Sequence, residues 1–265
     1  MNKKFKKIPL MRIGGLNNSN YLVKIQDEKY VLRIPSKDNK NNFHNENEIL
    51  NLIKPLNISP EIIYHNKDNG ILLSKYIESN KFDINFYNST NFVNLIVHRL
   101  NILHKQKSNN YFNPFKEIYD NINFLKSINF AFNHDINILV KKLKDLEKDL
   151  NKKIHYGLCH NDLNTSNILY CSNLVYLIDF EFSGMGDVFF DLATISWFLK
   201  DKLQDELIKS YFGYCNIELK NKLKNYLFVV KLWNATWSYV KSINSKSSYD
   251  YKLGGNIILD DLIKY

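Results

Sequence analysis

Polar residues between His160 and Glu181 have the types and the spacing that phosphoryl transfer requires. His160, Asp162 and Asn167 follow one another in the order H-x-D-x-x-x-x-N, and Asp179 comes twelve residues after Asn167. Phosphoryl transfer needs a carboxylate that orients an attacking hydroxyl and accepts its proton, and oxygen ligands that hold Mg²⁺ on the nucleotide phosphates. Asp162 suits the first role. Asn167 and Asp179 suit the second, because Mg²⁺ prefers oxygen ligands.

Each of these residues has an ordinary structural interpretation when it is taken alone. Asp162 could cap a helix or close a turn, and Asn167 could be a turn residue at the edge of a strand. A match to four specified residues at fixed spacing arises by chance roughly once in 10⁵ starting positions. The combination therefore predicts an ATP- and Mg²⁺-dependent kinase with Asp162 as its catalytic residue, and we expect His160 to brace the loop through hydrogen bonds.

The elements that must position these residues divide into a β-rich part and a helical part. Residues 21–25, 29–35 and 71–77 alternate or run apolar between turn-like segments, and residues 45–53 have the period of a helix. This order, β-β-α-β, predicts a small antiparallel sheet with one helix. Farther along the chain, apolar residues recur with helical spacing, and two short strands form a hairpin at 168–170 and 175–178. The predicted helices span residues 92–104, 135–150, 204–214 and 220–243.

The predicted fold class is therefore α+β, with two lobes and no repeat or linker that divides the chain further. Residues 1–79 form the expected nucleotide-binding lobe. Residues 80–265 form the expected helical lobe, which carries the catalytic loop and the acceptor site.

Two segments of the chain are similar to motifs of a known family. LCHNDLNTSNILY and IDFEFSGMGDVFFDLA resemble the catalytic loop and the metal-binding motif of choline/ethanolamine kinases of the bacterial choline kinase type. These enzymes are relatives of aminoglycoside phosphotransferases and protein kinases. Glu181 sharpens the match, since protein kinases carry glycine at that place. The resemblance implies a bilobal protein-kinase-like fold and a phosphotransferase with an alcohol acceptor, with ATP and Mg²⁺ as cofactors.

The resemblance also implies roles for two acidic residues that follow the metal-binding motif. Glu181 would contribute to the substrate-binding site, and Asp191 would tie the catalytic loop to the helical lobe. A helix N-cap before Leu192 is an equally open interpretation of Asp191.

The segment IGGLNNSNYLVKI resembles the family's phosphate-covering turn between two strands. Glycine allows close backbone approach in such a turn, so Gly15, with Asn18 and Asn20, is a candidate for binding the nucleotide phosphates. Taken without the downstream motifs, the same segment would be interpreted as an ordinary hairpin turn.

A basic residue is expected to pair with the ATP phosphates from the third strand. Arg33 lies at the position where protein kinases carry lysine, and its guanidinium could bind two phosphate oxygens at once. The helix glutamate that orients this cation is Glu46 or Glu48, and the spacing to Pro60 favours Glu46.

An aromatic cluster near the end of the chain could bind a quaternary ammonium. Trp233 and Trp237 share one face of a helix, and Tyr249 and Tyr251 follow. Aromatic faces attract such a cation without a hydrogen bond, which a quaternary ammonium cannot make. Trp233, Trp237 and Tyr251 are therefore predicted to bind choline, in a segment that resembles W-x-x-[x]-W-S-x-x-K of choline kinases. A helix that buries both tryptophans in the core is the competing interpretation.

Two departures from the family pattern keep the acceptor open. The tryptophans are four residues apart where some members show three, and an acidic residue expected near Trp197 is missing, with Asp201 as the only acid nearby. Ethanolamine and thiamine are therefore alternatives to choline. An aminoglycoside is disfavoured, because carboxylates should line a site for several ammonium groups. An ATP-binding pseudokinase scaffold is the alternative from outside the enzymes, although the catalytic and metal-binding residues are all present.

The composition limits the remaining classes of function. The net charge of +9 comes from lysines spread along the chain rather than from a basic stripe, so we expect no nucleic-acid partner. The sequence contains no run of about 18 apolar residues, which a membrane-spanning helix would require. The three cysteines have no C-x-x-C spacing, which favours reduced thiols. We expect a cytoplasmic monomer or homodimer that binds a small molecule.

Overall fold

The computed structural model describes residues 10–14, 18–36, 42–80, 83–245 and 249–264. These residues fall into two compact units. The first comprises the described residues within 1–81 together with Asn167–Glu181, and the second comprises those within 82–166 and 182–265. The sequence analysis drew its boundary after residue 79 and assigned the segment Asn167–Glu181 to the helical lobe, whereas the contacts group this segment with the first unit.

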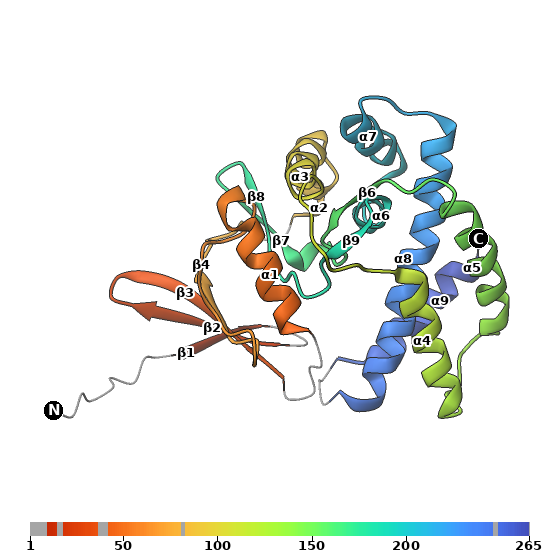
Figure 1. The fold of residues 1–265 in the computed structure, drawn as a ribbon, viewed down its shortest axis with the longest axis horizontal. Coiled ribbons are helices and arrows are strands. Elements are labelled where there is room, and N and C mark those ends of the chain that lie inside the picture. Colours follow the sequence, from red (N-terminus) through yellow and green to blue (C-terminus); the bar gives the residue numbers. More distant parts are fainter. Residues whose placement is uncertain (1–9, 15–17, 37–41, 81–82, 246–248, 265) are drawn as a thin grey trace. The chain divides into compact units, whose positions relative to one another are not determined.

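The first unit contains a five-stranded antiparallel sheet in the order β1-β2-β3-β5-β4 (Figure 1). Its strands are β1 (Leu10–Gly14), β2 (Asn18–Ile25), β3 (Glu28–Pro35), β4 (Ile62–His65) and β5 (Leu72–Lys75). The three strands expected from the sequence correspond to β2, β3 and β5. Strands β1 and β4 were not predicted, because each is too short to show a clear alternation.

One helix, α1 (Phe43–Ile53), packs in this unit, and a short 3₁₀ turn, η1 (Lys54–Leu56), continues it. The side chain of Asn42 accepts a hydrogen bond from the backbone N–H of Asn45 and so caps the helix. The side chains of Ile49 and Ile53 are fully buried. Spacing of three or four residues places them on one face of the helix, as the sequence predicted.

The hairpin formed by β7 (Ile168–Cys171) and β8 (Leu174–Leu177) belongs to the same unit. Ser172 and Asn173 both have positive φ, at 50° and 60°, which is the geometry of a two-residue hairpin turn. Leu177 N–H donates to Ile58 O at 2.8 Å, which joins the hairpin to the segment that follows η1. This bond is non-local, and a sequence pattern cannot reveal it.

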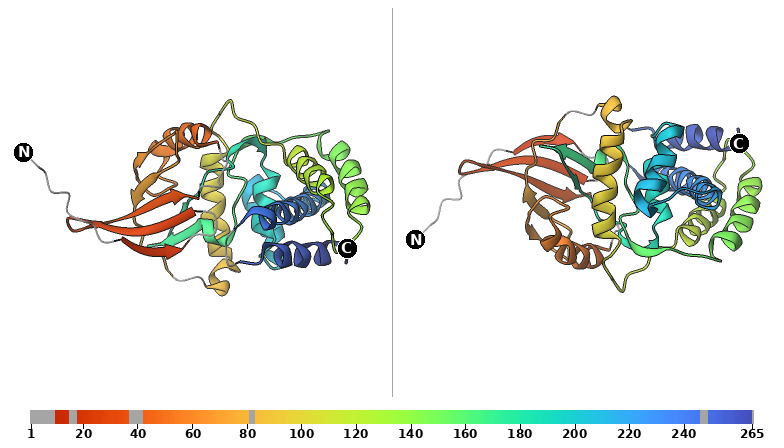
Figure 2. Two further views of the ribbon diagram at one scale, coloured as in Figure 1. Left: turned by 90° about the horizontal axis from the view of Figure 1, so that it is seen from below. Right: turned by 90° about the horizontal axis from the view of Figure 1, so that it is seen from above.

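The second unit is mainly helical (Figure 2). Its helices are α2 (Ile84–Tyr87), α3 (Thr90–Leu103), α4 (Pro114–Ser127), α5 (Ile136–Leu150), α6 (Phe189–Ser196), α7 (Asp201–Phe212), α8 (Ile217–Asn244) and α9 (Tyr251–Ile263). The short strands β6 (Tyr156–Cys159) and β9 (Gly184–Asp187) pair antiparallel beside them, and the 3₁₀ turn η2 (Thr165–Asn167) follows the catalytic loop. The four predicted helices correspond to α3, α5, α7 and α8.

Helix α8 is the centre of this unit, and α4, α6 and α9 all pack on it. The last of the helices predicted from the sequence corresponds to α8, whereas in the structure α9 follows and begins at Tyr251. Gly254 and Gly255 lie within α9 and lower its intrinsic helix propensity. A side chain at Gly255 would collide with the ring of Tyr239 on α8, so close packing explains this glycine.

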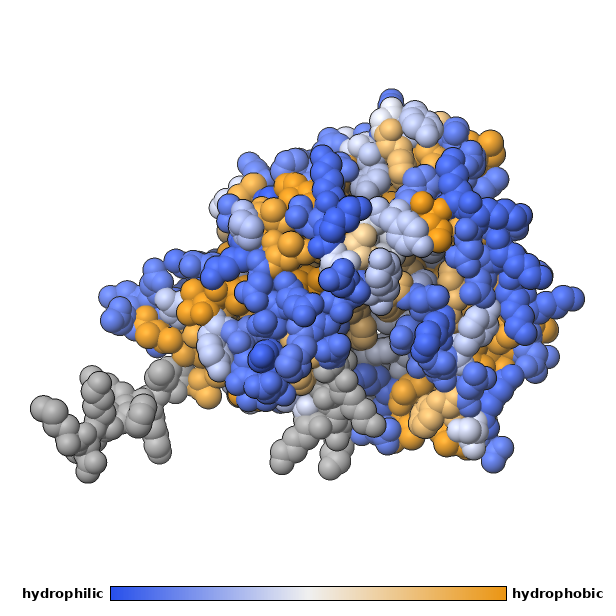
Figure 3. All heavy atoms as spheres, viewed as in Figure 1, coloured by the Kyte–Doolittle hydropathy of each residue, from blue (hydrophilic) through white to orange (hydrophobic). Residues whose placement is uncertain are grey.

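The surface shown in Figure 3 is mostly hydrophilic, with smaller apolar areas between the polar ones. Within the described ranges, none of the helices combines the length and the hydropathy that crossing a membrane would require.

Candidate active site

The catalytic loop follows β6 and is held by Asp191 of α6. The Asp191 carboxylate accepts the backbone N–H groups of His160 and Asn161, each at 2.7 Å, and its side chain is completely buried. Hydrogen bonds to a charged acceptor in a buried setting are strong, so they fix the direction in which the loop leaves β6. The predicted tie between the loop and the helical part is therefore present. The N-cap interpretation is wrong, because α6 begins at Phe189 and places Asp191 in its first turn.

His160 and Asp162 are arranged by hydrogen bonds within the loop itself. The backbone N–H of Asp162 donates to Nδ1 of His160 at 3.3 Å, and the amide of Asn164 donates to Oδ1 of Asp162 at 3.0 Å. His160 is fully buried, whereas Asp162 is half-buried. These contacts confirm that His160 braces the loop.

His104 is a further member of this network that sequence reasoning missed. Its Nε2 lies 3.0 Å from Asp191 Oδ2, and its Nδ1 lies 2.7 Å from the hydroxyl of Tyr211 on α7. Cys159 lies close to His104 and Asp191, and burial raises the pKa of its thiol. The Asp191 oxygens already accept backbone N–H groups, so we assign this cluster to holding the loop. No periodicity pointed to His104, because it sits just after α3 and far from the motif in sequence.

Asn161 is a second residue that the sequence analysis passed over. Its backbone has a φ of 66°, and its amide donates to the carbonyl of Phe182 at 2.9 Å. The bond joins the catalytic loop to the residue that follows Glu181. A positive φ is uncommon for residues other than glycine, and asparagine is among those that tolerate it best.

The predicted metal ligands, Asn167 and Asp179, lie at the two ends of the hairpin in the first unit. Ile178 N–H donates to the backbone oxygen of Asn167 at 3.1 Å, so the two ends of the hairpin are held together. The backbone of Asp179, which follows the hairpin, has a φ of 67°. Burial raises the pKa of Asp179, Arg33 opposes this shift, and the Glu46 carboxylate adds to it. Because burial disfavours the ionised form of Asp179, a nearby cation would stabilise that form.

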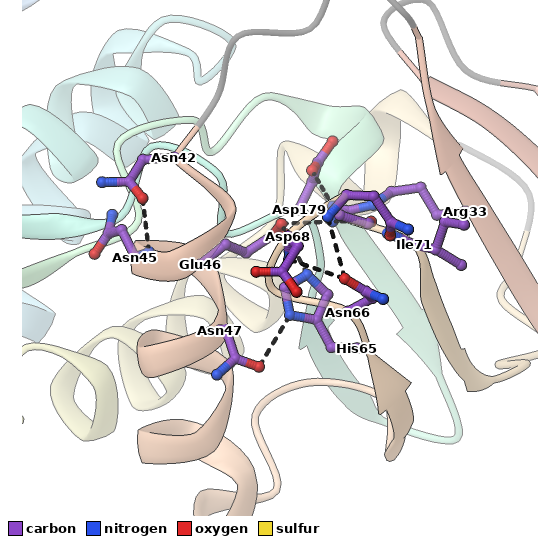
Figure 4. A network of polar contacts seen from close by, with 12 residues as sticks. Arg33, Asn42, Asn45, Glu46, Asn47, His65, Asn66, Asp68, Ile71 and Asp179 are labelled. Carbon is purple, nitrogen blue, oxygen red and sulfur yellow. Dashed lines mark hydrogen bonds and ion pairs between the residues drawn. The ribbon is translucent and has the colours of Figure 1, made fainter.

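Arg33 contacts two acidic residues of the first unit, Glu46 and Asp179 (Figure 4). Its Nη2 lies 2.5 Å from Glu46 Oε2, and its Nη1 lies 2.9 Å from Asp179 Oδ1. The Arg33 and Glu46 side chains are 7% and 1% exposed, and the Asp179 side chain is 27% exposed. Glu48 is exposed. Of the two glutamates left open by the sequence, Glu46 is therefore the partner of Arg33.

The register of the sheet places the candidate phosphate-binding residues relative to Arg33. Asn20 lies directly opposite Arg33, and Asn18 lies opposite Pro35. Residues directly opposite in an antiparallel pair share a face of the sheet, as do residues two apart on one strand. Asn18, Asn20 and Arg33 are therefore on one face. Gly15 lies outside the described residues.

Glu181 is the last residue of the first unit's second segment and is 7% exposed. Its negative charge contributes, after those of Glu46 and Asp179, to keeping the pKa of Arg33 above its ordinary value, although burial alone would lower that pKa. This places Glu181 in the electrostatic surroundings of the cation of Arg33.

The two tryptophans of α8 have different surroundings. Trp233 is 3% exposed and meets a set of phenyl rings edge to face, with centroids 5.3 to 5.9 Å away: Phe112, Phe182 and Phe190. Trp237 is half-buried, and its ring lies 5.9 Å from that of Tyr251. The Lys241 ammonium lies over the Trp237 ring at 5.2 Å. Among the described rings, Trp237 and Tyr251 are thus brought together, and Trp233 lies in a separate cluster.

Comparison with known proteins settles the family. A sequence model described as Choline/ethanolamine kinase matches residues 11–204. The chain belongs to this family. It is therefore a nucleotide-binding phosphotransferase that acts on the hydroxyl group of a small-molecule acceptor. A curated relative, Protein LicA of Haemophilus influenzae, is 29% identical over 93% of this chain and 77% of its own length.

Solved structures of family members share the fold. The choline kinase LicA from Streptococcus pneumoniae matches with a TM-score of 0.82 at 22% identity, covering 97% of this chain and 94% of that chain. A structure of LicA in complex with AMP matches with a TM-score of 0.81 at 21% identity, covering 100% and 94%. The predicted α+β, protein-kinase-like fold with an antiparallel N-terminal sheet and a larger helical part is thus confirmed.

Proposed function

We propose that this chain transfers the terminal phosphoryl group of ATP to the hydroxyl of choline, giving phosphocholine and ADP. Membership of the choline/ethanolamine kinase family supports the reaction. The neighbouring rings of Trp237 and Tyr251 are the observation that supports choline as the acceptor, because aromatic faces attract a quaternary ammonium. The Lys241 ammonium over Trp237 shows that this ring already serves as a cation partner within the chain.

We assign nucleotide binding to residues of the first unit. Arg33 would bind phosphate oxygens with its planar guanidinium while the buried Glu46 holds its orientation. Asn18 and Asn20 share the face of the sheet from which Arg33 projects, and they would lie along the phosphates.

Asn167 and Asp179 would hold Mg²⁺. Their fit rests on oxygen donors at the two joined ends of the hairpin and on an Asp179 carboxylate whose pKa is raised by burial. When bound, the ion would neutralise charge on the phosphate oxygens.

Asp162 is the proposed general base. Its carboxylate, held by Asn164 and half-exposed, would accept the proton of the acceptor hydroxyl as that oxygen bonds to the terminal phosphorus. The bond from this phosphorus to the bridging oxygen of ADP breaks at the same stage, and the proton leaves to water afterwards. General bases of this kind contribute about 10²- to 10⁴-fold to the rate.

Trp237 and Tyr251 would lie against the acceptor, and Glu181 is a further candidate for binding it. Trp233, enclosed by phenyl rings, would support the site from behind rather than touch the ammonium. This assignment favours choline over ethanolamine, whose primary ammonium gains more from hydrogen-bond acceptors than from ring faces.

A coupled assay of ADP release with choline, ethanolamine, thiamine and kanamycin as separate acceptors tests this proposal. We expect the highest kcat/KM with choline and a product that phosphorus NMR identifies as phosphocholine. A higher kcat/KM with ethanolamine or thiamine would overturn the choice of acceptor. ATP binding without turnover of any acceptor would instead favour the scaffold interpretation.

A further inference from the structure

His65 lies at the edge of the sheet in line with Arg33. The register pairs Arg33 of β3 with Leu72 of β5, and Leu72 with His65 of β4. Directly opposed residues share a face of the sheet, so Arg33 and His65 project on the same side, two strands or about 10 Å apart. Both therefore face the same helix, α1, from neighbouring positions of the sheet.

The side chain of His65 is 3% exposed, and both of its ring nitrogens face α1 (Figure 4). Nδ1 lies 3.1 Å from Oδ1 of Asn47, and Nε2 lies 3.5 Å from Oε2 of Glu46. Oε2 is the same oxygen that receives Nη2 of Arg33. The Asn47 amide oxygen and the Glu46 carboxylate are both acceptors, so the ring donates to both at once only when each nitrogen carries a proton. At 3.5 Å the contact of Nε2 with Glu46 is an ion-pair contact rather than a hydrogen bond.

The Glu46 carboxylate depends on these neighbours because it is 1% exposed. Burial by itself would raise the pKa of Glu46, but the contacts with His65 and Arg33 outweigh burial and lower it. Arg33 from β3 and His65 from β4 approach the same oxygen, Oε2, whereas Oε1 has no hydrogen-bond partner among the described residues. The contact with His65 therefore favours the orientation in which Oε2 faces Arg33.

We propose that His65 is a positioning residue for the nucleotide-binding cation: it holds Glu46 so that Glu46 holds Arg33 in register with the phosphates of ATP. Arg33 donates to Asp179 through Nη1 and to Glu46 through Nη2, whereas its Nε has no hydrogen-bond partner among the described residues. Glu46 is therefore an anchor that Arg33 can keep while it binds a phosphate oxygen. His65 keeps that anchor in place. The inference rests on the proposed role of Arg33 in ATP binding.

A pair of substitutions separates the two ring nitrogens. The amide nitrogen of glutamine reaches about as far as Nε2, and that of asparagine reaches about as far as Nδ1. We expect His65→Asn, which keeps only the contact to Asn47, to raise the dissociation constant for ATP by about tenfold, the factor that corresponds to about 1.4 kcal/mol. His65→Gln, which keeps the donor toward Glu46, should stay within about twofold of the unaltered chain.

Fluorescence titration with an ATP analogue, the KM for choline and the melting temperature should be measured on each variant. A purely structural role would shift the melting temperature of both variants without separating their ATP affinities. His44→Asn is the matched control, because His44 belongs to α1, the helix that His65 faces, but is exposed and lies beside Asp68 at the surface. It should bind ATP like the unaltered chain. Equal ATP affinity in His65→Asn and His65→Gln would overturn the inference.

A double-mutant cycle keeps the test decisive if either His65 variant is unstable. In a Glu46→Gln background, His65→Asn should change ATP affinity by less than about twofold, because His65 is proposed to act through Glu46. Additive effects would refute that route. Failure of the unaltered chain to bind ATP would refute the proposed function itself, whereas normal ATP binding with no effect of His65→Asn would refute only the role of His65.

Discussion

Asp162 and Asp179 are carboxylates with different surroundings, and the surroundings determine what each can do. Asp162 accepts a hydrogen bond from the neutral amide of Asn164, whereas Asp179 contacts the cation of Arg33 and has a raised pKa through burial. Two carboxylates in different environments can take different roles in one reaction. The half-exposed Asp162 suits proton transfer, and Asp179 suits charge neutralisation by a metal ion.

Replacing Asp162 by asparagine tests the residue that we assign to the proton. Asp162→Asn keeps the shape of the side chain and its contact to Asn164 but removes the basic oxygen. We expect kcat to fall by about 10²-fold or more, with the dissociation constant for ATP within about twofold. Steady-state kinetics and ATP titration measure the two quantities. A kcat within tenfold of the unaltered chain would exclude Asp162 as the base.

At the scale of single elements, helix α8 carries two tryptophans one turn apart with different environments. Trp233 is enclosed by phenyl rings, and Trp237 is half-buried beside Tyr251. The environment of each ring therefore depends on the elements that pack against it rather than on the spacing of the two tryptophans along the helix. The sequence could not distinguish the core position from the accessible one.

Alanine at each tryptophan should have a different effect. Trp237→Ala should raise the KM for choline by about 30-fold and leave the melting temperature nearly unchanged, since a desolvated cation–π contact is worth about 2 kcal/mol. Trp233→Ala should lower the free energy of unfolding by about 3–5 kcal/mol, because it opens a cavity among phenyl rings. Choline kinetics and urea unfolding check both. A normal choline KM in Trp237→Ala would remove Trp237 from the acceptor site.

Helix α6 holds the catalytic loop through one buried carboxylate. Asp191→Asn keeps the shape but weakens the hydrogen bonds from His160 and Asn161, and we expect the free energy of unfolding to fall by about 2–3 kcal/mol, together with a lower kcat. Urea unfolding gives the first value. Asp205→Asn on α7 is the control: Asp205 pairs with Lys220 at the surface, and its loss should change stability by less than about 1 kcal/mol. Equal effects of both variants would contradict this prediction.

At the scale of the whole molecule, the chemistry is distributed over two compact units. Asp162 belongs to the helical unit, while Arg33, Asn167 and Asp179 belong to the unit that contains the sheet. The chain passes from the catalytic loop to the hairpin within a few residues, so the proposed base and metal ligands are close in sequence despite their different units. Ligand binding should therefore be detectable in the stability of the full chain.

Binding of Mg²⁺ should be measurable as an increase in the melting temperature of the protein in the presence of ATP. A ligand that binds only the folded chain raises stability by about 2.7 kcal/mol at a concentration 100 times its dissociation constant. We expect ATP with Mg²⁺ to raise the melting temperature more than ATP with EDTA. In Asp179→Asn the increment due to Mg²⁺ should disappear. An undiminished increment in that variant would place the metal elsewhere.

The fold was predictable where the pattern was long and partly missed where elements were short. The apolar repeat predicted α3, α5, α7 and α8, because each has several turns with one buried face. Strands β1, β4, β6 and β9 have too few residues to show a period. Helix α4 was overlooked although Ile118, Ile122 and Leu125 form a helical apolar face, so a signal for it was present.

The sequence by itself determined the reaction, because the carboxylates and the amide of H-x-D-x-x-x-x-N and the later aspartate are specified by residue type and local spacing. It left Glu46 and Glu48 as alternatives and gave no indication of His65 or His104. The tertiary structure chose Glu46, since only that glutamate is buried against Arg33. Pairings between strands and helices far apart in the chain depend on how the core packs, and a local pattern does not contain that information.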